Sequence, residues 1–297
     1  MLETMKPELS KNNAHPPYPY PEKVSLEVKP WEKDWWLPEK GERETFLWLI
    51  LIHITALAGL ILYPLPGWPV FFGGFALAWL GGFGTTICYH RSLTHRGLTL
   101  NPIVKHLLIF LAMFNGSGAP ISWVASHRLH HAKSDTDEDV SSPRHGGFWW
   151  AHLRWLWQIP PTPVSRYCPD IDTSEYRIWT KLQPLILTVA YFLGLLFSPA
   201  AFFWCGGIRL VFALHGQCFV NSICHMAKDV KPGEDSSRNI VWLGFYQWFQ
   251  GENWHKNHHS NPALAQLGYN WKQLDMGWWA ILALKRLGLA SAVRGKT

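Results

Sequence analysis

Residues 45–63 read TFLWLILIHITALAGLILY, an apolar run that only His53 interrupts. At about 1.5 Å of rise per residue, a helix over this run spans roughly the 30 Å of hydrocarbon in a bilayer. The turn sequence PLPG follows, and a second apolar run, WPVFFGGFALAWLGGFGTTICY, covers residues 68–89. The two runs predict a hairpin of transmembrane helices.

A second pair of apolar runs lies at residues 182–197 and 202–220, with the turn SPAA between them. The 19 Trp and 16 Phe among 297 residues favour a membrane setting, because Trp gathers at membrane–water boundaries. The sequence therefore predicts an all-α integral membrane protein with four transmembrane helices in two hairpins. Residues 1–44, polar and rich in Pro, are expected to form a partly disordered tail, and residues 45–297 the membrane domain.

The distribution of Lys and Arg predicts the orientation of these helices. Neither turn carries a basic residue: seven lie in residues 1–44, ten between Tyr89 and Lys181, and nine after Asn221, which leaves only Arg209. By the positive-inside rule, both termini and the central segment lie on the cytoplasmic side. Because the formal charge of +6 is spread along the chain, nucleic acid is not expected as a partner.

Histidines are concentrated in four motifs at the predicted cytoplasmic ends of the helices. With 15 His in 297 residues, about 0.04 H-x-x-H-H windows are expected by chance, whereas two occur, HRLHH at 127–131 and HKNHH at 255–259. Residues three and four apart share a helix face, so each box predicts three imidazoles that reach a common volume. In HRSLTH, His90 and His95 would point about 140° apart on an ideal helix, so this box is expected to straddle the end of the second membrane helix.

The number of clustered histidines points to metal binding. Nine imidazoles exceed what one tetrahedral zinc takes, and two metals fit the count better. Imidazole suits iron, copper, nickel and zinc alike, so the ligand type leaves the metal open. Each metal-bound His also needs an acceptor for its other ring nitrogen. The acceptors nearest in sequence are Asp135, Asp137, Glu138, Asp139, Glu252 and Asn257.

The ordered motifs HRSLTH, SHRLHHAKSDTDEDVSSP, NSICH and GENWHKNHH resemble those of the membrane fatty acyl desaturases of the Δ9 type, which include acyl-CoA and acyl-lipid enzymes. The closing segment YNWKQLDMGWWAILALKRLGLASAV is similar to the C-terminal end of the acyl-lipid branch. The resemblance covers roughly residues 45–292. Two positions depart from the pattern, since the family commonly has Gly at Asn253 and Asn at Lys256.

The resemblance implies a helical cytoplasmic cap that carries a di-iron centre. Zinc would be a substitute in overexpressed protein, because imidazole sites accept it readily. Asn221 would approach one metal through a water molecule. The implied metal ligands are His90, His95, His127, His130, His131, His225, His255, His258 and His259.

The resemblance also implies the reaction and the partners. In the family, O₂ is reduced at the irons, and two hydrogens are removed from adjacent methylenes of a saturated acyl chain to give a cis double bond and water. The acyl chain is carried by a lipid, CoA or acyl carrier protein. The electrons come from a donor such as a ferredoxin or a cytochrome b5-like protein, and the absence of an HPGG haem-binding segment favours a separate donor.

The length of the acyl chain predicts where its tunnel ends. If the double bond forms beside His90, the remaining carbons extend about 10 Å along the second helix, or roughly seven to eight residues of rise. Counting back from His90 reaches Gly82 and, one turn further, Ala78, both small enough to admit the chain. The alternative is that these residues only allow close helix packing.

Two other functions share some of these features. A membrane di-iron hydroxylase or alkane monooxygenase would use the same metals and release an alcohol. A His-rich membrane metal transporter is disfavoured, because the apolar runs hold no acidic residue and the boxes lie at their ends rather than at mid-membrane. For Arg209, inside the fourth run, a structural partner, a place in the tunnel wall and snorkelling to the outer face all remain open.

Overall fold

The structure is a computed structural model that describes residues 29–227, 230–231 and 234–296. The predicted tail before residue 29 lies outside the described residues. The described part of the chain is mostly helical. Its two short strands, β1 (Thr99–Leu100) and β2 (Ala290–Ser291), pair antiparallel.

Four helices are long and apolar enough to cross a membrane, as the sequence predicts. They are α1 (Arg43–Leu62); α2 (Trp68–Phe83) continued by η2 (Gly84–Thr94); α8 (Ser174–Phe192) continued by η4 (Leu193–Leu196); and the run α9 (Pro199–Ala201), η5 (Phe202–Ile208), α10 (Arg209–Ser222) and η6 (Ile223–His225). The last three extend beyond the predicted bounds of 68–89, 182–197 and 202–220. Hydropathy detects only the apolar part of a helix, whereas backbone hydrogen bonds continue into its polar turns.

Shorter helices occupy the connections. They are η1 (Pro30–Glu32), α3 (Pro102–Phe114), α4 (Pro120–Lys133), α5 (Pro143–Trp149), η3 (Trp150–Arg154), α6 (Trp155–Gln158), α7 (Val164–Tyr167), α11 (Val241–Tyr246), α12 (His255–Ser260) and α13 (Met276–Arg286). Two of them begin with an N-cap side chain followed by proline at the first helical position. The side chain of Asn101 accepts from the N–H of Ile103 at the start of α3, and that of Ser142 accepts from the N–H of Arg144 at the start of α5.

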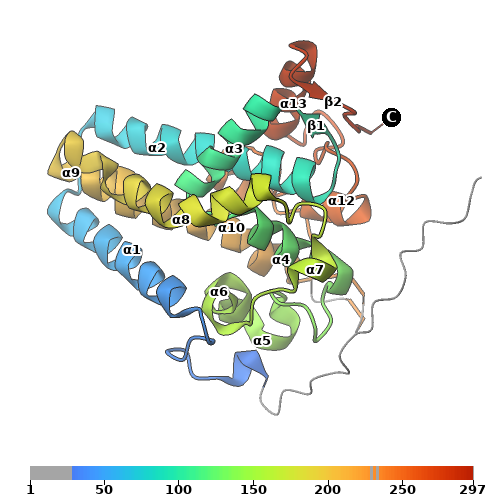
Figure 1. The fold of residues 1–297 in the computed structure, drawn as a ribbon, viewed down its shortest axis with the longest axis horizontal. Coiled ribbons are helices and arrows are strands. Elements are labelled where there is room, and N and C mark those ends of the chain that lie inside the picture. The colour runs from blue at the N-terminus through green and yellow to red at the C-terminus, as the bar shows by residue number, and fades with distance from the viewer. Residues whose placement is uncertain (1–28, 228–229, 232–233, 297) are drawn as a thin grey trace, which may run out of the picture.

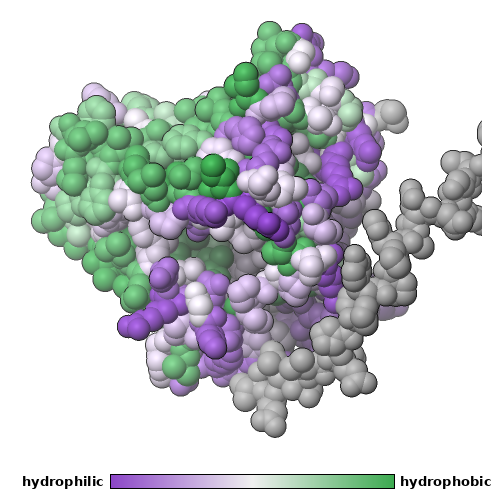
Figure 2. Space-filling view, in the orientation of Figure 1, coloured by the Kyte–Doolittle hydropathy of each residue, from purple (hydrophilic) through white to green (hydrophobic). Residues whose placement is uncertain are grey.

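The two ends of the bundle differ in composition. In Figure 1 the turns that join α1 to α2 and η4 to α9 lie together at the left, and α4, α7, α12 and α13 lie toward the right, with α5 and α6 below the centre. We call the first the turn end and the second the histidine end. Figure 2 shows hydrophobic side chains gathered toward the turn end and polar ones toward the histidine end. This division suits a bundle whose turn end is embedded in hydrocarbon.

Glycines allow the helices to approach closely. A Cβ atom at Gly84 would lie 2.4 Å from the carbonyl oxygen of Leu108, and one at Gly206 would lie 2.4 Å from that of Tyr191. η2 therefore touches α3 backbone to backbone, and η5 touches α8 in the same way. Small residues at helix interfaces are the usual means of tight packing in membranes.

Arg209 has a structural role. Its buried guanidinium donates to the carbonyl oxygens of Phe114 (3.0 Å) and Ala190 (3.1 Å) and to the side chain of Asn115 (3.0 Å). It thereby satisfies acceptors at the C-terminal end of α3, where helix carbonyls lack internal partners. The sequence left three roles open for Arg209, and the one observed is binding to a structural partner inside the bundle.

We predict that Gly84→Ala lowers the apparent unfolding temperature, because the added methyl group must displace the backbone of α3. Such overpacking typically costs about 1–3 kcal/mol. Gly73→Ala in α2 is the matched control, since nothing lies within 4 Å of its Cβ position and alanine favours helix. Thermal unfolding of the three proteins in detergent checks this. A Gly84→Ala protein as stable as the control would contradict the close contact.

Candidate metal centre

The first histidine box lies on a π-helix. η2 is π-helical from Gly84 to Thr94, and His95 is its C-cap residue. A π-helix pairs residues five apart, so His90 and His95 face the same side, with ring centroids 5.0 Å apart. The box straddles the helix terminus, as the sequence predicts, but the 140° separation of an ideal α-helix does not apply, because this turn is π-helical.

The second and third boxes each divide between two clusters. On α4, His127 and His131 join one cluster and His130 joins the other. On α12 the arrangement is reversed, because the pair four apart, His255 and His259, joins the second cluster and His258 joins the first. The expectation that each box serves one common volume is therefore wrong. Residues four apart share a face, whereas the intervening residue points to a different side of the helix.

The five-histidine cluster consists of His90, His95, His127, His131 and His258, whose candidate ligand atoms lie within 4.8 Å of one another. Their Nε2 atoms converge. The Nε2 of His258 lies 3.0 Å from that of His90 and 2.9 Å from that of His131. The rings come from η2, α4 and α12, so three segments distant in sequence meet here.

The four-histidine cluster consists of His130, His225, His255 and His259, again within 4.8 Å of one another. The Nε2 atoms of His225 and His255 are 2.8 Å apart. His225 lies on η6 at the end of the fourth long helix. The two boxes on α4 and α12 thus contribute to both clusters and hold them side by side.

Carboxylates hold the opposite ring nitrogen of four of these histidines. The Nδ1 atom of His90 lies 2.8 Å from Glu252, and that of His130 lies 3.0 Å from Asp139. The Nδ1 atom of His225 lies 3.4 Å from Asp135, and that of His259 lies 3.2 Å from Asp235. Asp135, Asp139 and Glu252 are acceptors expected from the sequence. Asp235 was missed, because it lies far from His259 along the chain in a loop without a motif.

The other expected acceptors lie elsewhere. Asp137 pairs with Lys29 at 3.5 Å and Glu138 with Lys133 at 3.0 Å, both at the surface. Asn257 donates to the carbonyl oxygen of Leu267 at 2.8 Å. Proximity in sequence therefore identified half of the candidates correctly.

The protonation of the clustered histidines favours a cation in each cluster. A neutral imidazole carries one N–H, and where Nδ1 donates to a carboxylate, Nε2 keeps a lone pair. The Nε2 atoms of His130 and His259 are buried without a hydrogen-bond partner among the described residues. Several lone pairs aimed at one small volume repel each other unless a metal ion lies between them. The donor set thus fits one metal in each cluster.

The electrostatics of the site keep most of the rings neutral. Burial and the neighbouring imidazoles hold the pKa well below its usual value in His95, His127, His131, His255 and His258. Burial, opposed by Asp235, lowers the pKa of His259 to about 4. Burial also acts on His130, but the charge of Asp139 outweighs it and raises the pKa. Neutral rings are the form that binds a metal.

A buried ion pair fixes the third box against the first. The guanidinium of Arg91, next to His90, pairs with Asp275 at 2.9 Å. It also donates to the carbonyl oxygens of Ala265 (2.8 Å) and Gln250 (2.7 Å), on either side of α12 in the chain. Arg91 therefore clamps the segment that carries the third box. No motif marked this contact in the sequence.

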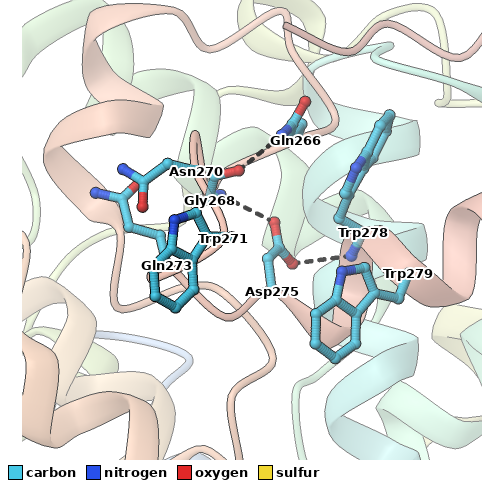
Figure 3. A pocket seen from close by; sticks show the side chains of 8 residues that line it. All are labelled: Gln266, Gly268, Asn270, Trp271, Gln273, Asp275, Trp278 and Trp279. Atoms are coloured by element: carbon cyan, nitrogen blue, oxygen red, sulfur yellow. Dashed lines mark hydrogen bonds between the residues drawn. The ribbon is translucent and has the colours of Figure 1, made fainter.

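Asp275 also organises the loop before α13. Its carboxylate accepts from the N–H of Gly268 (3.2 Å) and that of Trp278 (2.8 Å), as Figure 3 shows. A pocket of about 250 Å³ opens beside it, lined by Gln266, Gly268, Asn270, Trp271, Gln273, Asp275, Trp278 and Trp279. The Asp275 carboxylate is already bonded to backbone N–H groups and to Arg91, and no histidine of the two clusters lines this pocket. We therefore treat the pocket as part of the Arg91–Asp275 contact region.

A cavity of about 920 Å³ inside the helix bundle reaches the two histidine clusters. Its wall includes His90, His127 and His130, and both predicted tunnel residues, Ala78 and Gly82. Asn221 also lines this cavity. The contact of Asn221 to a metal through a water molecule stays a prediction. A cavity of this volume, lined largely by apolar residues and lying beside the clusters, suits an acyl chain.

One further residue narrows the cavity near Gly82. A Cβ atom at Gly82 would lie 2.3 Å from the side chain of Gln250, which donates to the carbonyl oxygen of Trp79 at 2.8 Å. No sequence motif indicates this contact.

Comparisons with known proteins agree with this site. The family model "Fatty acid desaturase" matches residues 66–287. Delta-9 acyl-lipid desaturase 2 of Arabidopsis thaliana is 32% identical over 237 residues, which are 77% of this chain and 76% of that protein. The sn-2 palmitoyl-lipid 9-desaturase of Nostoc sp. (strain 36) is 31% identical over 86% of this chain and 93% of its own length.

A second cyanobacterial relative, the sn-1 stearoyl-lipid 9-desaturase of Anabaena variabilis, is 32% identical over 84% of this chain and 92% of its own length. The family match covers both clusters and three of the four apolar helices, and α1 lies before its first residue. The chain therefore belongs to the fatty acid desaturases, a family of oxidoreductases that act on acyl chains.

Proposed function

We propose that this chain is an O₂-dependent desaturase that introduces a cis double bond at the Δ9 position of a saturated, lipid-bound acyl chain. The observation that carries the proposal is the pair of histidine clusters, each with converging ring nitrogens, beside one cavity whose wall includes His90 and His127 of one cluster and His130 of the other. The names of the relatives, acyl-lipid and 9-desaturases, support the position of the bond and the carrier.

The proposed cofactor is a pair of iron ions, with zinc as a substitute in overexpressed protein. The ligands of one iron are the five-histidine cluster, and those of the other are the four-histidine cluster with Asn221 through a water molecule. Iron at these positions supplies the oxidising chemistry that an unactivated methylene needs, since such a carbon has no acidic proton and no leaving group. The overall reaction consumes O₂, two electrons and two protons and yields an alkene and two waters.

The side chains of the protein position the ligands and the substrate. Glu252 accepts from Nδ1 of His90 and from the hydroxyl of Thr86, which fixes the ring beside the cavity. The cavity excludes bulk water and aligns the chain along the clusters. Ala78 and Gly82, with Gln250 against Gly82, form the proposed tunnel end that measures chain length.

The remaining proposals concern partners and orientation. The electrons come from a separate donor, a ferredoxin or a cytochrome b5-like protein. Residues 45–297 form the membrane desaturase domain. The absence of Lys and Arg from residues 63–67 and 197–201 supports a cytoplasmic active site with both termini on the same side.

Expression in a host that lacks desaturases should produce cis-unsaturated fatty acids, identified by mass spectrometry of the derivatised chains. His131→Ala should abolish them, since it removes a ligand of the five-histidine cluster. His106→Ala is the control, because this ring lies on α3 outside both clusters and contacts Glu175. Alcohols in place of alkenes would identify a hydroxylase and refute the proposal.

The purified chain should hold two metal ions, and Asp235→Asn should weaken the retention of one of them. Loss of such a carboxylate typically costs about 10–100-fold in metal affinity. Asp137→Asn, on an exposed carboxylate paired with Lys29, is the matched control. Elemental analysis after graded chelator treatment gives the metal content. A fully loaded parent with a single metal ion would refute the dinuclear centre.

A cysteine placed in the first turn tests the orientation. Leu65 is 91% exposed and suits this better than Gly67, whose φ of 85° disfavours a side chain. Leu65→Cys should react with an impermeant thiol reagent in intact cells, and Asp137→Cys only after permeabilisation. The reverse pattern would place the active site on the outer side.

A further inference from the structure

Residues 241–250 form a wedge between two of the long helices. The wedge consists of α11 and the turn that follows it, with α2 on one side and α10 on the other. The ring of Tyr246 stacks on that of Phe212 in α10, with centroids 4.4 Å apart. The ring of Trp248 meets that of Phe75 in α2 at 4.0 Å. Both partners belong to helices that are long and apolar enough to cross a membrane.

The contacts of the wedge lie deep in the bundle. Phe75 lies 15 residues before His90, and Phe212 lies 13 residues before His225. Each separation corresponds to roughly 20 Å along a helix. The tip of the wedge, residues 246–248, therefore contacts the apolar helices far from the metal clusters, at a depth where hydrocarbon surrounds the bundle.

The wedge has a cavity face and a lipid face. On the cavity face, the lining residues are Tyr246, Gln247, Trp248 and Gln250. On the opposite face, the exposed apolar residues are Val241, Trp242 and Phe245. Trp248 both lines the cavity and is 44% exposed. Because apolar side chains exposed at this depth face lipid, the wedge is a thin partition between the cavity and the bilayer.

The base of the wedge is anchored by backbone groups at the histidine end. The N–H of Ile240 donates to the carbonyl oxygen of Asn253 at 2.9 Å. The carbonyl oxygen of Gln250 accepts from Arg91 at 2.7 Å. Both ends of the wedge are thus fixed to the segment that carries the third histidine box.

The tip is held more weakly than the base. Among the described residues, the hydrogen bonds from the tip to α10 come from two side chains. Tyr246 donates to the carbonyl oxygen of Phe212 at 3.0 Å, and Gln247 donates to that of Gly216 at 2.8 Å. The tip can therefore separate from α10 without any change in the backbone of that helix.

The turn at the tip is strained. Trp248 has a φ of 51° and Phe249 a φ of 57°, although neither is glycine. Bulky residues rarely adopt this left-handed conformation, because it brings the side chain close to the backbone. Strain of this kind is concentrated in segments that clamp ligands or change conformation. A second arrangement of the turn would relieve it.

We propose that the wedge is a lateral gate of the cavity, whose tip moves away from α2 and lets an acyl chain pass between the bilayer and the cavity. The proposal rests on the desaturase function and adds the route of the chain. Hydrocarbon lies on one side of the wedge and the cavity on the other, so the chain crosses without passing through water. A gate changes the rates of binding and release and leaves the affinity nearly unchanged, because opening affects both rates alike.

A reversible cross-link across the gate tests this. Phe75→Cys and Trp248→Cys are combined in the full chain and joined with a short bifunctional thiosulfonate reagent. The probe is radiolabelled stearic acid, chased from the purified protein with unlabelled acid. We expect the cross-link to slow release at least about tenfold, and a reductant to restore it. The pair Trp68→Cys and Phe72→Cys is the matched control, since both residues lie on α2 outside the cavity wall.

A single substitution tests the gate in the opposite direction. Tyr246→Phe keeps the ring but removes the hydrogen bond to α10, so it should speed both binding and release of the probe severalfold with little change in Kd. Tyr191→Phe is the control, because it removes a tyrosine hydroxyl that lies 2.5 Å from the hydroxyl of Thr55, between α8 and α1. This variant decides the question if the double-cysteine protein does not fold.

The outcomes separate the gate from the desaturase function. Unchanged release after complete cross-linking, verified by mass spectrometry, would overturn the gate, and so would equal acceleration in Tyr246→Phe and Tyr191→Phe. The desaturase function fails on a different measurement, the absence of alkenes in the expression host. Cross-link-dependent release in a protein that forms no alkene would still support the gate.

Discussion

The site depends on the hydrogen bond between a carboxylate and the Nδ1–H of a histidine ring. Where Glu252, Asp139, Asp135 or Asp235 accepts this proton, the Nε2 lone pair of the same ring is committed to face its neighbours. Each cluster could hold a metal ion, and a bound ion would stabilise this end of the bundle. Asp135 and Asp139 are fully buried, and the cost of burying them is offset by the rings that they contact.

The rest of the fold keeps these segments in register. The π-helix at η2 turns His90 and His95 to one side, and Arg91 in the same turn ties the segment around α12 to it through Asp275. Arg209 serves a similar purpose deeper in the bundle, where it binds carbonyl oxygens of α3 and α8. Glycine contacts such as that of Gly84 bring the helices close enough for these bonds to form. Packing and polar contacts thus act together.

The cavity lies beside both histidine clusters. Residues of α1, α2, α8 and α10 line the same cavity as His90, His127 and His130, so an acyl chain in it would lie next to both clusters. The carboxylates that contact the clustered histidines differ in exposure, since Asp135 and Asp139 are buried whereas Asp235 is 41% exposed.

The sequence by itself determined the four helices, the identity of the clustered histidines and the family, because apolar length and box spacing are local properties that one segment carries alone. It did not determine how HRLHH and HKNHH divide between two clusters, since that depends on which face of α4 meets α12. Nor did it reveal Asp235, Arg91 with Asp275, or Gln250 against Gly82, whose partners are distant in the chain. Only the tertiary structure decided these contacts, because side chains become neighbours through packing rather than through sequence spacing.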